Sequence, residues 1–271
     1  MLATPAAALV WVTRVIAFAV LLATIETFAM RRAAADDGVW RWALVRRELE
    51  VFPRPVRALL DATLRYPGFL ALLGVRALAA VALLVPPVAA VPAVAPGALA
   101  VLLVSTLLLA LRWRGSVNGG SDFMTLTVLT ALTVAAACPT RPLVALGATW
   151  YIALQACNSY FVAGVVKLKS AAWREGRALP AVLAGAVHDA TPLRTLLTRR
   201  PWLARVAGHA VLALECSFPL ALWRPEACLA LCGLALAFHL ANVYVFGLNR
   251  FLWAWAATYP ALYYCSQAHG R

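Results

Sequence analysis

A few ionisable side chains stand inside long apolar stretches of the chain, where a charge costs about 2.5 to 3.5 kcal/mol on insertion into a bilayer. These residues are Arg14, Glu26, Arg76, His209, Glu215 and His239. Each needs a partner or a polar cavity. For Arg14, Glu26 and Arg76 two interpretations stay open: an ion pair between two helices with snorkelling arginines, or a substrate or proton pathway.

The two histidines raise the question of a metal site. His239 and Asn242 are three residues apart and share one helix face, whereas His209 and Glu215 are six apart and do not. The chain has no HxxxH, HExxH or CxxC spacing, which zinc sites usually show. We therefore expect no metal, and a buried hydrogen bond between a histidine and Glu215.

Lys167 directly follows the apolar stretch 143–166. The later part of this stretch contains polar residues, among them Asn158 and Tyr160. Burial disfavours the charged form of a lysine and makes it a usable base. The other interpretation is a boundary lysine that reaches into the headgroup region and helps to orient the chain. Both interpretations are open at the level of residue chemistry.

The composition decides the class of protein. Of the 271 residues, 63% are hydrophobic and 13% are charged, about half the charged fraction of a soluble domain, which is roughly 25%. The net charge of +13 would suit a nucleic-acid-binding protein, but such proteins do not contain many long apolar stretches. The numbers indicate an all-α polytopic membrane protein whose partner is the lipid bilayer, with no nucleic acid.

Eight stretches are apolar and about long enough to span a bilayer, which takes roughly 20 residues. They cover residues 6–30, 69–91, 98–111, 123–138, 143–166, 203–223, 227–247 and 251–266. Three of them are shorter than 18 residues, so we expect a bundle of seven or eight transmembrane helices. We see no internal repeat, and residues 1–271 are predicted to form a single transmembrane domain.

Two long polar segments interrupt these stretches. Residues 31–66 mix tryptophan with arginine, which is typical of an interfacial helix or cytoplasmic loop. Residues 167–205 form a basic loop in which a half-helix is expected near residues 181–187. With eight spans, nineteen of the 24 basic residues fall in alternate loops and three on the opposite side. The positive-inside rule then predicts that both segments are cytoplasmic and both termini outside.

The stretch NSYFVAGVVKLKSAAWREGRAL, residues 158–179, carries the most specific pattern of the chain. It resembles the vitamin K-dependent gamma-carboxylase superfamily and its short bacterial relatives, the horizontally transferred transmembrane (HTTM) domain proteins. The matching positions are Tyr160, Phe161, Ala163, Gly164, Lys167, Leu168, Trp173 and Gly176. Further matches follow in order at Glu215, Pro219, Phe238, His239, Leu240, Asn242 and residues 247–266.

The resemblance implies that Lys167 is the base of a membrane enzyme. With it we group Glu215 and His239 as catalytic candidates. The candidates for a substrate cavity are Asn118, Asn158, Tyr160 and Asn242. Gly120 stands where the carboxylases have a functional histidine, and the chain ends before the large extramembrane part of those enzymes, so glutamate carboxylation is not expected.

Two functions are therefore left open for a protein of the bacterial cytoplasmic membrane. In the first, the domain acts on a quinone-like or other lipid-soluble molecule, with a quinone-like compound as substrate or cofactor. In the second, it is a non-catalytic component, such as a transport, toxin-export or immunity partner, and its polar residues only pack helices. Whether the protein is an enzyme is not decided by the sequence.

Overall fold

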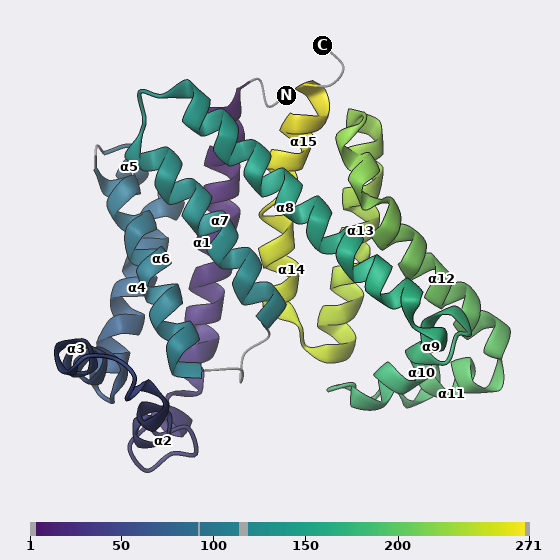
Figure 1. Cartoon of the computed structure of the whole chain (residues 1–271), viewed down its shortest axis with the longest axis horizontal. Coiled ribbons are helices and arrows are strands. Elements are labelled where there is room, and N and C mark those ends of the chain that lie inside the picture. The colour runs from purple at the N-terminus through teal and green to yellow at the C-terminus, as the bar shows by residue number, and fades with distance from the viewer. Residues whose placement is uncertain (1–3, 92, 114–118, 269–271) are drawn as a thin grey trace. The chain divides into compact units, whose positions relative to one another are not determined.

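The computed structural model describes residues 4–91, 93–113 and 119–268. All regular structure in these ranges is helical (Figure 1), which confirms the all-α class. The chain divides into two compact units, and each is described by itself. The N-terminal unit comprises Val10–Ala148, and the C-terminal unit comprises Thr149–Arg271 together with Met1–Leu9.

Four long helices form the N-terminal unit, and short helices connect them. The long ones are α1 (Pro5–Ala29), α4 (Gly68–Leu84), α6 (Val94–Trp113) and α7 (Gly119–Ala137). The short ones are η1 (Arg31–Ala34), α2 (Trp42–Arg46), η2 (Arg47–Leu49), α3 (Arg54–Leu64) and α5 (Pro86–Ala89). Along the chain, α4, α6 and α7 pack in sequence, α4 on α6 and α6 on α7.

Arg76 of α4 is buried in the N-terminal unit and is held by hydroxyl groups of two other helices. Its Nε donates to Thr24 Oγ1 at 3.0 Å, and its Nη1 donates to Ser105 Oγ at 2.9 Å and Thr106 Oγ1 at 2.6 Å. The same Nη1 donates to the Leu102 carbonyl at 3.3 Å. These contacts connect α4 to α1 and α6. The hydroxyl partners were not expected from the sequence, and both interpretations, the ion pair with snorkelling arginines and the pathway, stay predictions.

The segment between α1 and α4 folds onto the end of α6. The Arg112 guanidinium is buried among aromatic rings and donates through Nη2 to the carbonyls of Ala34 at 2.8 Å and Trp40 at 3.3 Å. The Trp113 ring meets the Trp40 ring edge to face. Arg112 and Trp113 at the end of α6, which the charge pattern places on the same side of the membrane as residues 31–66, therefore contact that segment at one end of this unit.

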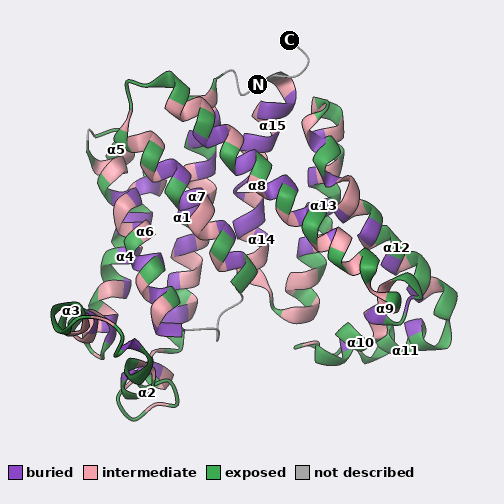
Figure 2. Ribbon diagram, in the orientation of Figure 1, coloured by how far each residue is buried: buried purple, intermediate pink, exposed green. Residues whose placement is uncertain are grey.

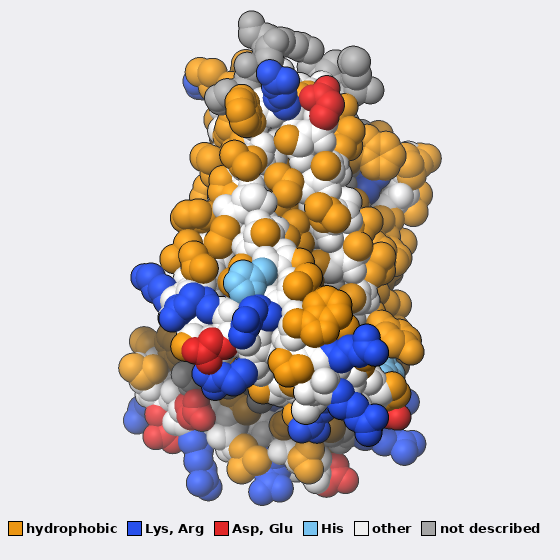
Figure 3. All heavy atoms as spheres, turned by 90° about the vertical axis from the view of Figure 1, so that its right-hand side faces the viewer, with side chains coloured by type: hydrophobic (Ala, Val, Ile, Leu, Met, Phe, Trp, Pro, Cys, Tyr) orange, Lys and Arg blue, Asp and Glu red, His pale blue; other side chains and the backbone are white. Residues whose placement is uncertain are grey.

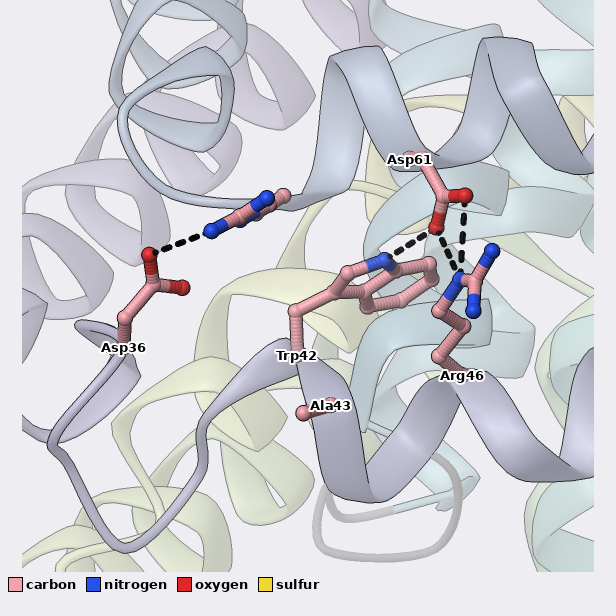
Figure 4. Close-up of a pocket in the computed structure, with 6 residues that line it drawn as sticks. Asp36, Trp42, Ala43, Arg46 and Asp61 are labelled. Carbon is pink, nitrogen blue, oxygen red and sulfur yellow. Dashed lines mark hydrogen bonds and ion pairs between the residues drawn. The ribbon is translucent and has the colours of Figure 1, made fainter.

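This segment also holds a surface pocket of about 560 Å³, lined by Asp36, Trp42, Ala43, Arg46, Asp61 and Arg65 (Figure 4). Asp61 of α3 accepts hydrogen bonds from the Trp42 indole at 2.7 Å and from Arg46 Nε at 2.7 and 3.0 Å. Arg65 pairs with Asp36 at 3.2 Å. The predicted surface segment is thus a set of short helices connected by ion pairs.

The C-terminal unit contains three long helices and several short ones. Its long helices are α8 (Pro142–Lys169), which enters the unit at Thr149, α12 (Pro201–Ser217) and α13 (Pro225–Phe246). The others are α9 (Ala171–Arg174), α10 (Ala178–Val182), η3 (Leu183–Gly185), α11 (Thr191–Arg199), η4 (Phe218–Leu222), α14 (Asn249–Ala256) and α15 (Tyr259–Ala268). Proline begins each long helix, where its missing N–H costs no hydrogen bond.

The basic segment 167–205 contacts the end of α13 within the C-terminal unit. The backbone N–H groups of Val187 and His188 donate to the Val245 carbonyl at 3.1 and 3.4 Å. Val245 lies in the last turn of α13, which ends at Gly247 with a φ of 67°, a left-handed conformation that glycine adopts without strain. The predicted half-helix is present as α10 and η3, and α11 follows it. The orientation in the membrane stays a prediction.

Five helices in the described ranges are long and apolar enough to cross a membrane, or six if the bent pair α3 and α4, at 74°, counts as one span. They are Pro5–Ala29, Val94–Trp113, Gly119–Ala137, Pro201–Leu222 and Pro225–Phe246. Each of the eight predicted stretches corresponds to a helix or a pair of helices. The count of seven or eight is not confirmed, because α8 carries polar residues such as Gln155 and Asn158, and α14 and α15 are short.

Many residues along these helices are exposed (Figure 2), and large apolar side chains are common among them. On α13, Leu229 and Leu234 are each 60% exposed. A soluble protein seldom exposes extended apolar surface of this kind, whereas lipid chains would cover it in a membrane.

Candidate functional site

One face of α8 positions the candidate residues of the C-terminal unit. Tyr160, Gly164 and Lys167 are spaced by four and three residues, so they form one stripe along the helix. This stripe contacts α12 and η4 at Glu215, Cys216 and the Phe218 ring. The residue types that resemble the family motif thus make one helix–helix interface.

Gly164 allows α8 and α12 to approach closely. A Cβ atom at this position would lie 2.7 Å from Cys216 Sγ, 2.9 Å from the Cys216 backbone nitrogen and 3.0 Å from Glu215 Cβ. Any side chain would therefore push α12 away from α8. The glycine brings the backbone of the Glu215 turn within reach of the side chains on the α8 stripe.

Lys167 and Glu215 form a partly buried ion pair next to this contact. Lys167 Nζ donates to both carboxylate oxygens of Glu215 at 2.7 Å. The Glu215 side chain is 5% exposed and that of Lys167 is 24% exposed. The ammonium also lies 5.6 Å from the centre of the Trp173 ring, within the range of a cation–π contact. Lys167 is thus the solvent-facing member of a pair whose acid is enclosed.

A second polar group lies two helical turns before Lys167 on α8. The Tyr160 hydroxyl is 2.6 Å from His239 Nε2 and 3.2 Å from the Tyr259 hydroxyl. The Tyr160 ring stacks on Phe218 with centroids 3.8 Å apart. His239 is 1% exposed, and its Nδ1 has no hydrogen-bond partner in the described part of the chain.

Aromatic rings enclose His239 on the side of α14. Phe251 and Trp255 stack with centroids 4.1 Å apart, and their rings lie 5.5 and 5.8 Å from the imidazole. The chain breaks its helix at Ala257 and Thr258 before α15 begins at Tyr259. This break lets α14 supply the rings and α15 supply the Tyr259 hydroxyl to the same cluster.

The turns after α8 hold the Trp173 ring next to the Lys167 ammonium. Gly176 has a φ of 79°, and a Cβ there would lie 2.6 Å from the Arg205 backbone nitrogen. The chain can therefore turn tightly against the first turns of α12 only with glycine at this position. Both Trp173 and Gly176 belong to the pattern that carries the resemblance. Here Trp173 lies beside Lys167, and Gly176 allows the turn that follows it.

The structure brings together four of the predicted site residues in two contacts, Lys167 with Glu215 and Tyr160 with His239. The expected hydrogen bond between a histidine and Glu215 is wrong, because the carboxylate binds Lys167. His209 is exposed, and its Nδ1 contacts the Arg205 carbonyl at 2.8 Å.

The three asparagines fit the site less well. Asn158 is exposed on α8. Asn242 is half-buried, and its main-chain carbonyl accepts the Leu248 N–H at 3.4 Å where α13 ends. Asn118 lies outside the described residues. Their placement in a substrate cavity stays a prediction.

Tyr259 and Phe218 are contacts that sequence reasoning missed. The Phe218 ring stacks on Tyr160 and the Tyr259 hydroxyl bonds to the Tyr160 hydroxyl, but no spacing rule relates these residues, since 99 residues separate Tyr160 from Tyr259. In the described ranges, no group of three or more His, Cys, Asp or Glu residues could hold a metal ion.

Residues 134–267 match the family of the HTTM domain. The chain contains an HTTM domain. The match begins near the end of α7 and includes every residue of the two polar contacts described above. No curated protein and no solved structure matched the chain. The predicted HTTM domain is confirmed for these residues, whereas the likeness to the gamma-carboxylases and the extension of one domain over residues 1–271 stay predictions.

The HTTM domain and the apolar helices together make this an integral membrane protein. Lys167 of the ion pair lies at the end of α8. Tyr160 of the hydroxyl–imidazole cluster lies two turns earlier in the same helix. The polar side chains of these two contacts therefore form two separate groups along α8, with aromatic rings beside each of them.

Proposed function

We propose that the HTTM domain binds a lipid-soluble, quinone-like molecule and transfers a proton to or from it at the Lys167–Glu215 pair. The observation that carries this proposal is the pair itself, with both carboxylate oxygens at 2.7 Å from Nζ and Glu215 only 5% exposed. A buried ion pair stabilises a fold little more than apolar residues of the same size would, and often less. Its presence inside a membrane domain therefore favours a chemical role.

The exposure of the two side chains assigns their roles. Lys167 is the accessible member, so its Nζ is the atom that meets a ligand, while Glu215 receives or returns a proton behind it. The ammonium has three N–H donors, two of which are used by the carboxylate. The third is directed to a ligand oxygen or to the Trp173 ring.

Proton transfer at this pair takes two balanced steps. First, one N–H proton moves from Lys167 to an oxygen of Glu215, which leaves a neutral amine and a neutral carboxylic acid. Apolar surroundings favour this neutral pair relative to water, because they disfavour both charges. The amine then accepts a proton from an acidic O–H or C–H of the bound molecule, whose anion faces the restored ammonium.

The Tyr160–His239 contact provides a second polar point for the same kind of ligand. His239 Nδ1 is free of partners within the described residues, and the rings of Phe251 and Trp255 stand beside it. Aromatic rings and a single hydrogen-bonding nitrogen suit a flat, largely apolar molecule with few polar atoms. This favours a quinone-like compound over a sugar or a peptide.

The test is ligand capture followed by binding. The protein is purified in detergent, bound lipids are extracted, and quinones are identified by mass spectrometry. Binding of a short-chain quinone is then followed by quenching of tryptophan fluorescence. We expect Lys167→Met to weaken binding at least tenfold while Lys169→Met, which changes an exposed lysine two residues on, leaves it unchanged.

The non-catalytic alternative rests on one observation. The polar groups of each contact largely satisfy one another, and Gly164 makes the interface close, which is what helix packing alone would require. If Lys167→Met/Glu215→Leu folds, keeps the cellular phenotype and binds quinone as the wild type does, the proton-transfer proposal is rejected and the packing role stands.

A further inference from the structure

We propose that α11 and the first turns of α12 form a binding surface for the headgroups of anionic phospholipids. We name residues 191–206 the α11 platform. The proposal is independent of any chemistry at Lys167, and it concerns a part of the molecule that contains none of the residues of the Tyr160 cluster. It rests on charge, on position relative to the membrane and on exposed apolar side chains.

The α11 platform carries an excess of positive charge. It contains four arginines, Arg194, Arg199, Arg200 and Arg205, and no acidic residue. None of the four arginines forms an ion pair with a described residue, whereas Glu175, earlier in the same basic segment, is paired with Arg177. The segment's other acid, Asp189, accepts the Thr191 N–H at 2.9 Å. Because the Thr191 N–H is neutral, Asp189 keeps its negative charge beside the platform and offsets one of its four positive charges.

The depth of the α11 platform in the membrane follows from α12, whose first turns belong to the platform. Pro201–Leu222 is long and apolar enough to span a membrane. Trp202 and Val206, in its first turns, are 62% and 58% exposed on one face. An exposed tryptophan at the end of a span is typical of the headgroup region. Since α11 ends at Arg199, two residues before the span begins, it lies at the same depth.

The apolar side chains of α11 fit this depth. Leu197 is the only residue of α11 that is buried, and it packs with Leu183 and Ala204. Leu193 and Leu196 are 44% and 42% exposed. They lie about 40° and 100° round the helix from Leu197. An exposed apolar strip beside arginines is the pattern of a helix lying in the membrane interface.

Figure 3 shows the arrangement on one face of the molecule. Lysine and arginine side chains gather in its lower part, and a broad hydrophobic surface extends above them. Anionic headgroups would meet the arginines while their acyl chains cover the hydrophobic surface. Phosphate groups match the planar, bidentate guanidinium better than they match other side chains.

The test compares two triple variants that remove the same charge from different segments. Full-length protein is presented with equal amounts of phosphatidylglycerol and phosphatidylcholine in mixed micelles, and bound lipids are counted by native mass spectrometry. In the platform variant, Arg194, Arg199 and Arg200 become glutamine. In the matched variant, the exposed Arg41, Arg47 and Arg54 become glutamine.

We expect the platform variant to lose roughly tenfold or more of the preference for phosphatidylglycerol, since each arginine near an anionic surface contributes a several-fold effect. The matched variant is expected to keep most of that preference. Equal losses in the two variants would show that net charge alone decides lipid binding and would overturn the proposal, as would an unchanged platform variant.

A measurement on the wild-type chain covers the case in which the platform variant does not fold. Quenching by brominated lipids is measured for the wild type and for Trp202→Phe, and the difference reports on Trp202. Stronger quenching by brominated phosphatidylglycerol than by brominated phosphatidylcholine supports the proposal. Equal quenching by the two lipids contradicts it.

Discussion

The polar segments 31–65 and 167–205 each contain eight basic residues, but they handle the charge differently. The first also contains five acidic residues, and Asp61 and Asp36 pair with Arg46 and Arg65 around the pocket of Figure 4. The second contains two acidic residues. Its first basic residue, Lys167, pairs instead with an acid of a transmembrane helix, Glu215.

The difference in burial decides what each pair is worth. Arg46 and Asp61 are 54% and 29% exposed, whereas Glu215 is 5% exposed. Exposed pairs contribute about 0 to 1 kcal/mol, because water competes for both charges. A buried pair is costly to break from one side, because a charge is left without a partner. The first segment therefore connects surface helices, and the second fixes a charge inside the protein.

The largest effect is expected for Lys167→Met. It leaves the Glu215 carboxylate enclosed without its counter-ion, at a cost of about 3 to 5 kcal/mol. The midpoint of thermal unfolding in detergent, followed by size-exclusion chromatography with fluorescence detection, should fall steeply. Lys167→Met/Glu215→Leu is the control and should recover most of the loss. If Lys167→Met were as stable as the wild type, the buried pair would contribute no more to stability than the exposed Arg46–Asp61 pair.

Gly164→Ala should have the next largest effect. The added Cβ meets backbone and side-chain atoms of Cys216 and Glu215 at 2.7 to 3.0 Å, so α8 and α12 must separate, at a cost of about 1 to 3 kcal/mol. Gly147→Ala in the same helix is the matched control, because nothing lies within 4 Å of its Cβ position. The same thermal measurement should show a loss for the first variant and no loss, or a small gain, for the second.

A smaller effect is expected at Asp61, and two substitutions separate its contacts. Asp61→Ala leaves the buried Trp42 indole without its acceptor, which costs about 1 to 2 kcal/mol. Asp61→Asn keeps an oxygen for the indole and removes only the ion pair with Arg46, so thermal stability should hardly change. If the asparagine variant is as unstable as the alanine variant, the surface pair matters more than its exposure indicates.

The smallest effect concerns Asp189, which precedes α11. Hydrogen bonds from the Thr191 side chain and backbone lower the pKa of the Asp189 carboxyl below its ordinary value. A lowered pKa in the folded state means that the contact stabilises the fold above the ordinary pKa, roughly 4, and is lost as the pH falls through the folded value. Titration of ¹³C-labelled aspartate carboxyls by NMR, assigned with Asp189→Asn, should show this carboxyl titrating below the ordinary range. A midpoint at or above that range would contradict the contact.

Much of the helical layout was predictable because hydropathy acts along the chain. Each of the eight apolar stretches corresponds to a helix or a helix pair, and the surface segment at 31–66 folds as short helices. The number of membrane spans was harder to predict, because polar residues lower the hydropathy of α8 and the break before Tyr259 divides the last stretch into two short helices.

The pairing of polar residues was not predictable, because it depends on which helices meet and at what rotation. Glu215 was expected to bind a histidine, yet the absence of a side chain at Gly164 brings its turn to Lys167 instead. Likewise, Arg76 donates hydrogen bonds to the hydroxyl groups of Thr24 and Ser105, and no spacing in the sequence relates these residues.

The Lys167–Glu215 contact also determines how the site responds to the membrane potential. A matched pair has no net charge, so the potential exerts no net force on it. A proton that passes between Nζ and a carboxylate oxygen moves by less than the 2.7 Å separating these two atoms, and so by less than a tenth of a hydrocarbon core of about 30 Å. At 100 mV, where a full crossing is worth about 2.3 kcal/mol, this step involves less than about 0.2 kcal/mol. The internal proton step should therefore run equally well in energised and de-energised membranes.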